Sequence, residues 1–88
     1  MPKRVDANQP TIVRDLREAG ATVEHLHTIG HGCPDILVGF RGRSWVFEIK
    51  SPGGAMTPDE VKWHEEWRGQ VHVIYSAAEA LRIMWGIE

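Results

Sequence analysis

The hydrophobic and polar positions in the middle of this chain predict a β-hairpin. Two runs of apolar, β-branched and aromatic residues, Asp35 to Phe40 and Ser44 to Lys50, are separated only by Arg41-Gly42-Arg43. Runs of this length joined by a short glycine-containing segment are typical of two strands and a tight turn. We therefore expect these two segments to pair as antiparallel strands.

The register of this hairpin decides where its acidic side chains lie. A loop centred on Arg41-Gly42 pairs residue 40 with residue 43, and the same register puts Asp35 directly opposite Glu48. Directly opposed residues share one face of the sheet, with Cβ atoms about 4.5–5.5 Å apart, and strand alternation adds Lys50 to that face. A slip of one residue would put the two carboxylates on opposite faces. The turn at Gly42 therefore controls the prediction.

The rest of the chain predicts three helices and two further strands. A helix from about Pro10 to Ala19 is expected to end at Gly20. Capping boxes, in which a Ser or Thr stands three positions before a Glu, begin at Thr57 and Ser76 and open the other two helices. The remaining expected bounds are a strand over Thr22 to His27, a helix end near Arg68, a strand over Val71 to Tyr75, and a last helix containing Leu81, Met84 and Trp85.

This order of elements predicts an α/β fold. The strand, helix, strand portion implies a last strand parallel to its predecessor. The expected structure is an α-β-β-β-α-β core with a mixed sheet flanked by helices, plus a C-terminal helix. The 88 residues, 42% of them apolar and 25% charged, suit one domain over residues 1–88, with residues 1–7 as a flexible arm. A core this small gives limited stability, so we expect a homodimer.

Two features bear on where the chain works. It has no apolar stretch of membrane-spanning length and no apolar segment behind its N-terminal charges, so we expect neither a membrane span nor a secretory signal. Its single cysteine, Cys33, cannot form an internal disulfide, which suits a reducing intracellular compartment.

Asp35, Glu48 and Lys50 together suit metal-assisted hydrolysis of a phosphodiester. Two opposed carboxylates repel each other unless a cation lies between them, and hard oxygen ligands favour Mg²⁺ or Mn²⁺. A lysine beside the metal can orient an attacking water, lower the pKa of that water or stabilise the charge on a pentacovalent phosphate. If the three side chains converge, the chain is expected to be a nuclease.

The residues around these positions resemble the PD-(D/E)xK nucleases, and most closely their VRR-Nuc branch of virus-type replication and repair nucleases. The resemblance covers nearly the whole chain and includes glycines and prolines in the expected order. It consists of Asn8-Gln9 before the first helix, Gly30 to Gly39, Glu48-Ile49-Lys50 followed by Ser51 to Gly54, and Met56-Thr57-Pro58 leading to Trp63-His64.

The resemblance implies a restriction-endonuclease-like fold and a divalent-metal-dependent DNA nuclease. Asp35 and Glu48 would bind Mg²⁺ or Mn²⁺, the Ile49 backbone carbonyl would add a ligand, and Lys50 would assist the nucleophile. Related enzymes, including Holliday junction resolvases, carry a glutamate where this chain has Gln9, whose carbonyl can hold a metal-bound water. They also carry a glutamine where this chain has Glu60, which the capping box explains without catalysis. Branched DNA such as Holliday junctions or flaps is the implied substrate, and a virus or phage the implied source.

The formal net charge of −2 argues against a DNA-binding protein, which is usually basic. Positive charge is nevertheless concentrated near the candidate site, because residues 1–50 carry seven Lys or Arg against six acids, and residues 51–88 carry three against six. Phosphate contacts are expected from Lys3 and Arg4 on the N-terminal arm, Arg41 and Arg43 at the hairpin tip, and Arg14 or Arg17 on the first helix. Solvated surface charge is the alternative for each of them.

Two other functions fit the same residues. A non-catalytic DNA-binding or assembly module could keep the nuclease fold, a view favoured by Gln9 and the acidic balance. An intracellular structural subunit could use the carboxylates and Lys50 as an ordinary cross-strand salt-bridge cluster. Trp63 and Trp67, four residues apart on one helical face, are expected in the core or at a subunit interface more than as a base-stacking platform.

Other chemistry is weakly indicated. His25, His27, His31 and Cys33 could supply zinc ligands, but structural zinc sites usually show paired ligands at turn spacings, and a second cluster is missing. Residues 64–68 begin like a zincin helix, yet Arg68 stands where the second histidine should be. Cys33 lacks an evident activating partner other than His31 and is expected to be a small structural thiol.

Overall fold

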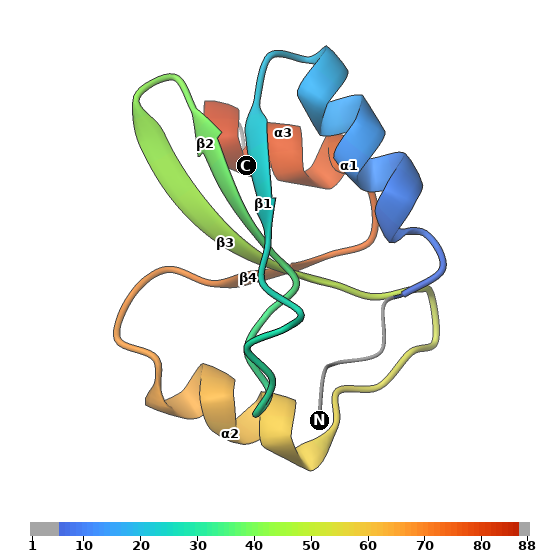
Figure 1. The fold of residues 1–88 in the computed structure, drawn as a ribbon, viewed down its shortest axis with the longest axis vertical. Helices are drawn as coiled ribbons and strands as arrows, with labels where there is room; N and C mark the ends of the chain where they lie inside the picture. The colour runs from blue at the N-terminus through green and yellow to red at the C-terminus, as the bar shows by residue number, and fades with distance from the viewer. Residues whose placement is uncertain (1–5, 87–88) are drawn as a thin grey trace.

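The computed structural model describes residues 6–86 of the chain, so Lys3 and Arg4 of the predicted arm lie outside the described residues. It confirms the predicted α/β fold with a C-terminal helix (Figure 1). In chain order the elements are α1 (Gln9–Glu18), β1 (Thr22–His25), β2 (Ile36–Phe40), β3 (Arg43–Ile49), α2 (Pro58–Glu66), β4 (His72–Ile74) and α3 (Ala77–Trp85).

The four strands form one mixed sheet in the order β1-β2-β3-β4. β1 to β3 are antiparallel neighbours, and β4 runs parallel to β3, as the strand, helix, strand portion predicts. β1 and β4 are therefore the two edges of the sheet. None of the helices within residues 6–86 is long and apolar enough to cross a membrane.

The register of the central hairpin is the predicted one. Phe40 pairs with Arg43 and Ile36 pairs with Phe47. Arg41 and Gly42 both have positive φ angles, 54° and 79°, as two-residue hairpin turns of type I′ require. The turn that sets the position of the site is thus a two-residue loop.

One detail at the other end of this hairpin differs from the prediction. The pairing stops at Ile36, and the backbone N–H of Asp35 donates to the Phe47 carbonyl at 3.1 Å. Asp35 is therefore one residue outside the strand and is not paired directly opposite Glu48. The first strand also ends at His25, two residues before the predicted end, because its partner β2 begins only at Ile36.

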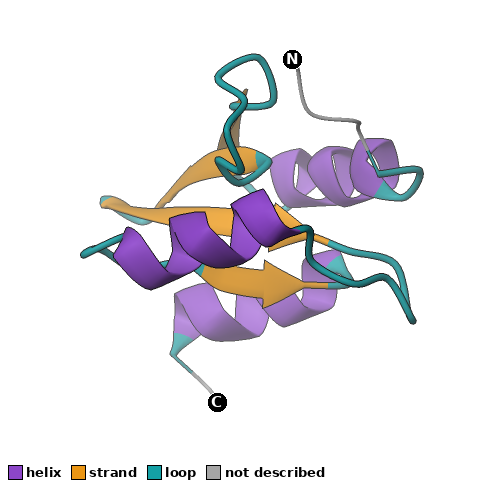
Figure 2. Ribbon diagram, turned by 90° about the horizontal axis from the view of Figure 1, so that it is seen from below, coloured by secondary structure: helices purple, strands orange, loops and turns teal. Residues whose placement is uncertain are grey.

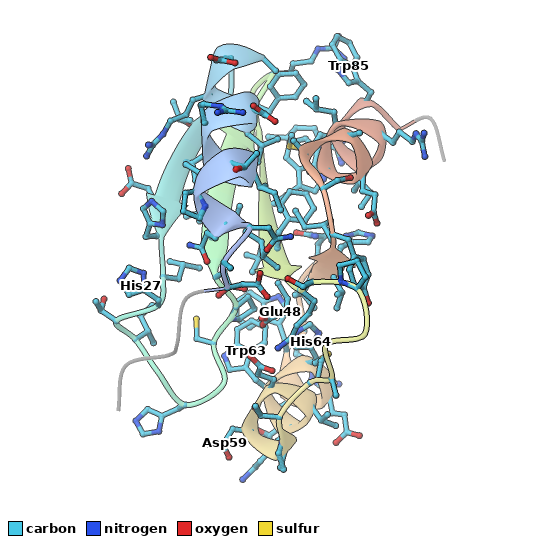
Figure 3. All side chains as sticks on the ribbon, turned by 90° about the vertical axis from the view of Figure 1, so that its right-hand side faces the viewer. His27, Glu48, Asp59, Trp63, His64 and Trp85 are labelled. Atoms are coloured by element: carbon cyan, nitrogen blue, oxygen red, sulfur yellow. The ribbon has the colours of Figure 1, made fainter. Side chains whose placement is uncertain are left out.

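The hydrophobic core lies between one face of the sheet and two helices. α1 contributes Ile12, Val13 and Leu16, and α3 contributes Ala80 and Met84. α1 and α3 lie side by side over the strands (Figure 3). Trp45, Phe47 and Ile49 of β3 all belong to this core, so the opposite alternation places Glu48 on the other face.

α2 stands apart from the other helices. It lies at the bottom of Figure 1 and nearest the viewer in Figure 2, away from the core that α1 and α3 cover. The predicted capping box is present: the Thr57 hydroxyl accepts from the Glu60 N–H, and the Glu60 carboxylate accepts from the Thr57 N–H. The helix ends at Glu66, two residues before the predicted end, because Trp67 has an extended backbone.

The second capping box is half formed. The Ser76 hydroxyl accepts from the Glu79 N–H, as predicted, whereas the Glu79 carboxylate accepts from the Tyr75 N–H one residue further back. Both helices that follow β3 therefore begin where the sequence predicts, each fixed by its own side chains.

The segment between β1 and β2 packs tightly against the start of α2. Gly32, with a φ of +80°, lies so close to α2 that a Cβ atom there would collide with the Asp59 backbone carbonyl. Gly53 has nearly the same φ, +82°, but nothing lies within 4 Å of the Cβ position. A comparison of the two glycines therefore distinguishes the effect of a positive φ angle from the effect of close packing.

We expect Gly32→Ala to destabilise the protein more than Gly53→Ala. Each substitution places a side chain at positive φ, which costs about 1–2 kcal/mol, and Gly32→Ala adds an overpacking cost of about 1–3 kcal/mol. Urea unfolding of the two variants measures the difference. Equal losses would contradict close packing of Gly32 against α2.

Candidate active site

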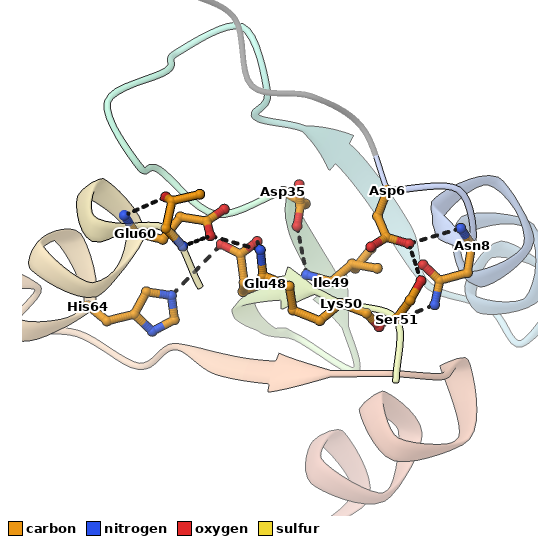
Figure 4. A network of polar contacts seen from close by, with 10 residues as sticks. Asp6, Asn8, Asp35, Glu48, Ile49, Lys50, Ser51, Glu60 and His64 are labelled. Carbon is orange, nitrogen blue, oxygen red and sulfur yellow. Dashed lines mark hydrogen bonds and ion pairs between the residues drawn. The ribbon is translucent and has the colours of Figure 1, made fainter. Parts of the chain in front are cut away.

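The predicted site residues gather where β3 ends. Figure 4 shows Asp35, Glu48 and Lys50 together, with Glu60 and His64 of α2 on one side and Asp6 on the other. Asp35 and Glu48 are only 1% and 0% exposed, and the Lys50 side chain is 13% exposed. Charged side chains are seldom buried to this degree unless they are paired or bind a cation.

Asp35 is held by the backbone of the strand beside it. Its Oδ2 accepts a hydrogen bond of 2.6 Å from the Ile49 N–H, and its backbone carbonyl accepts one of 2.8 Å from the Leu26 N–H. The side chain thus continues the contact between β2 and β3 beyond the last paired residue. This contact brings the Asp35 carboxylate to the Glu48-Ile49-Lys50 segment although direct pairing with Glu48 is absent.

Lys50 is fixed from two directions. Its Nζ lies 2.8 Å from Glu60 Oε1 and 3.9 Å from Glu48 Oε2, while its backbone N–H donates to the Ile74 carbonyl of β4. Because Glu60 is also the capping residue of α2, the start of that helix and the position of the ammonium group depend on one carboxylate. Glu60 has the predicted capping role and a contact with Lys50 in addition.

His64 is a site residue that sequence reasoning missed. It lies one helical turn after Glu60, and its Nε2 is 3.9 Å from Glu48 Oε1. The i, i+4 spacing of Glu60 and His64 was the available signal, since it puts both side chains on one face of α2. An imidazole here adds a second nitrogen near the buried Glu48 carboxylate.

Asp6 also joins this region without having been predicted. Its Oδ1 accepts from the Ser51 hydroxyl at 2.9 Å and from the Asn8 N–H at 3.1 Å. Asn8 in turn donates from Nδ2 to the Lys50 carbonyl at 3.3 Å. These contacts attach the chain before α1 to the end of β3, an arrangement that depends on residues more than forty positions apart and leaves no local signal.

Gln9 is the first residue of α1 and is 1% exposed. Its Nε2 lies 3.1 Å from His25 Nδ1 on β1. Its side chain lines a groove between α1 and β1, together with His25 and His27. The Gln9 side chain therefore contacts β1. Its role in holding a metal-bound water stays a prediction.

The arginines predicted to contact DNA are spread over the molecule. Arg41 and Arg43 are separated from Lys50 by the length of β3, roughly 20 Å at about 3.4 Å per residue. The Arg41 guanidinium lies 4.0 Å above the Trp85 ring, and that of Arg43 lies 5.3 Å from the Trp45 ring. Arg14, on α1, pairs with Asp15 at 3.0 Å.

The donors at the end of β3 fit a hydrated hard cation. Within the described part of the chain, no three His, Cys, Asp or Glu side chains are grouped so that they could hold a metal by themselves. Mg²⁺ usually keeps several water ligands and needs one or two carboxylates. Asp35 and Glu48 supply carboxylates of that kind, and the zinc alternative at His25, His27, His31 and Cys33 stays untested.

Comparisons with models of protein families, with curated proteins and with solved structures found no match to this chain. The resemblance to VRR-Nuc nucleases therefore depends on the sequence motifs alone and stays a prediction.

We expect Glu48→Gln to stabilise the protein in the presence of a chelator. The Glu48 carboxylate is 0% exposed, and Lys50, which lies 3.9 Å from it, is also paired with Glu60 at 2.8 Å. A neutral amide of the same shape avoids the desolvation cost of the buried carboxylate, and Lys50 keeps its contact with Glu60, so the change should add about 1 kcal/mol or more to the free energy of unfolding.

Urea unfolding in EDTA measures this change, with Glu65→Gln at an exposed position of α2 as the control. Saturating Mn²⁺ should reverse the order, because a cation bound only by the folded wild type stabilises it by about 2.7 kcal/mol at a hundred times its Kd. A Glu48→Gln variant that is less stable in EDTA would contradict this account of the site.

Proposed function

We propose that this protein is a divalent-metal-dependent DNA endonuclease that hydrolyses phosphodiester bonds. The observation that supports this function best is the burial of Asp35 and Glu48 beside a lysine held 2.8 Å from Glu60. This set contains oxygen ligands for a hard cation and an ammonium group fixed next to them. The resemblance to VRR-Nuc nucleases points to the same residues.

Each residue has a separate task in the proposed reaction. Asp35 and Glu48 would hold Mg²⁺ or Mn²⁺ with the Ile49 carbonyl, and the bound cation would supply Lewis acidity toward the phosphate. Lys50 orients the attacking water and stabilises the developing negative charge on the phosphate. Glu60 positions the ammonium group of Lys50. The amide nitrogen of Gln9 contacts His25, and a role for its carbonyl in holding a metal-bound water stays a prediction.

The burial of charge favours a metal site over an ordinary salt-bridge cluster. A structural salt bridge between exposed groups costs little desolvation, but here the carboxylates of Asp35, Glu48 and Glu60 are almost fully buried. Burial of several carboxylates is costly, and a bound cation would offset part of that cost. The arrangement therefore suits a protein whose function requires the cation.

The proposed substrate is branched or otherwise structured DNA, and the proposed active form is a homodimer. We propose that it acts inside the cell, with a virus or phage as a possible source of the gene. A dimer would present two sites to two strands of a branched duplex. Exposed apolar side chains on and after α2, including Val61 and Trp67, offer a surface for a second copy. Trp67 is 43% exposed and stacks on Trp63 at 4.6 Å, so this pair lies outside the core.

A non-catalytic DNA-binding module is the second candidate. Gln9 favours it, because a neutral amide at this position brings no negative charge to a metal. The same cleavage experiment distinguishes the two functions.

We expect the purified protein to cleave labelled four-way junctions or flaps in Mg²⁺ or Mn²⁺ and not in EDTA. Asp35→Ala, Glu48→Gln and Lys50→Ala should each reduce the cleavage rate at least about a hundredfold, because each removes a group that stabilises the transition state. Lys62→Ala changes an exposed lysine of α2 and should leave the cleavage rate unchanged.

Thermal unfolding of each variant separates loss of chemistry from loss of fold, and Glu48→Gln is the variant expected to stay folded. DNA binding without cleavage in every metal would favour the non-catalytic module. Neither binding nor cleavage would favour a structural subunit.

A further inference from the structure

A groove of about 410 Å³ lies between α1 and β1, away from the carboxylates at the end of β3. We name it the α1–β1 groove. Its lining residues are Gln9, Pro10, Val13, Arg14, Arg17, His25 and His27. Apolar, aromatic and cationic groups therefore surround one space.

The lining has the chemistry of a nucleotide-binding surface. Pro10 and Val13 supply apolar contacts for a flat ring, and the imidazoles of His25 and His27 lie edge to face with centroids 5.8 Å apart. Arg14 and Arg17 lie three residues apart on the same side of α1, and one Arg17 amino group donates to the Val23 carbonyl at 3.1 Å, which leaves its other N–H groups for a ligand. Guanidinium groups bind phosphate through paired hydrogen bonds, and bases stack on aromatic or apolar side chains.

Buried polar atoms in the groove lack partners. Gln9 Oε1 and His27 Nδ1 are both buried and make no hydrogen bond to any residue within 6–86. If His25 carries its proton on Nδ1, the Gln9 amide turns over to accept it, and the amide nitrogen becomes the unsatisfied group. Either way, a 1% exposed amide keeps a free hydrogen-bonding atom, which is costly unless a ligand uses it.

Two hydrogen bonds connect this groove to the candidate active site. Asn8, directly before Gln9, donates to the Lys50 carbonyl, and Leu26, between the two histidines, donates to the Asp35 carbonyl. Gln9, His25 and His27 form one end of the groove. Their direct neighbours in the chain, Asn8 and Leu26, thus contact Lys50 and Asp35 of the candidate site. His27 and Glu48 lie at the same level of the molecule in Figure 3.

We propose that the α1–β1 groove binds one nucleotide, with the base against Pro10 and Val13, a base edge at the Gln9 amide, and the phosphate at Arg14 and Arg17. The proposal deepens the nuclease function and rests on it for the identity of the ligand, which would be a nucleotide of the DNA strand beside the scissile phosphate. A free nucleoside monophosphate carries the same chemistry.

The test measures binding in EDTA, so that it does not depend on cleavage. Titration of the protein with a short single-stranded oligonucleotide, with thymidine monophosphate and with inorganic phosphate is followed by NMR of the histidine imidazoles. We expect the oligonucleotide to shift the His25 and His27 signals saturably. An equal response to the monophosphate would identify a free nucleotide as a sufficient ligand, and a response to the oligonucleotide alone would identify a strand segment.

A charge reversal provides the matched variant. Arg14→Glu changes an exposed side chain that is paired with its neighbour Asp15, so the fold should survive. It should weaken binding at least about tenfold, as the loss of one charge-assisted hydrogen bond predicts. Arg82→Glu, an exposed arginine on α3, should bind like the wild type.

Three results would overturn the proposal: oligonucleotide binding that leaves both histidines unshifted, equal shifts with inorganic phosphate alone, or no binding by any of the three ligands. Cleavage of DNA without binding in this groove would remove the groove proposal and keep the nuclease. Binding in this groove without cleavage in any metal would remove the hydrolytic function and keep the groove.

Discussion

The contact between Lys50 and Glu60 holds the candidate site together. One carboxylate closes the capping box of α2 and accepts the lysine ammonium at 2.8 Å, so the first turn of a helix and the residue that follows β3 are fixed by one group. α2 has few other attachments to the core, since Glu60 is its one buried residue. The close approach of Gly32 to Asp59 adds a second attachment at the same end of the helix. Movement of α2 would therefore also move Lys50 and His64.

This arrangement places function and stability in opposition. The apolar side of β3 packs Trp45, Phe47 and Ile49 into the core, and the same strand carries Glu48 to a place without exposure to water. Burial of the Asp35, Glu48 and Glu60 carboxylates costs desolvation, and under the proposed function a bound divalent cation would offset that cost. Sites that perform chemistry commonly retain such a cost, because the same low exposure strengthens electrostatic interactions with the substrate.

Local signals in the sequence predict most of the fold. The Arg41-Gly42 turn sets the hairpin register because both residues adopt positive φ, and Thr57 sets the start of α2 through a reciprocal hydrogen bond.

Asp35 departs from the predicted pairing. It directly precedes β2, and its carboxylate accepts from the Ile49 N–H, a tertiary contact that the alternation of side chains along a strand does not predict. Asp6 and His64 were missed for a related reason, since their places depend on how the chain before α1 and the helix α2 dock on β3. The large distance from Arg41 and Arg43 to Lys50 follows from the length of β3 alone, so it could have been predicted from the sequence.

The central claim is that the buried carboxylates at the end of β3 form a divalent cation site. Diffraction from crystals soaked in Mn²⁺, recorded at the manganese absorption edge, tests it most directly. The account predicts an anomalous peak within roughly 2.0–2.2 Å of oxygen atoms of both Asp35 and Glu48, and no such peak in Glu48→Gln crystals. A wild-type crystal without a peak there, with Lys50 and Glu60 still in contact, would contradict it.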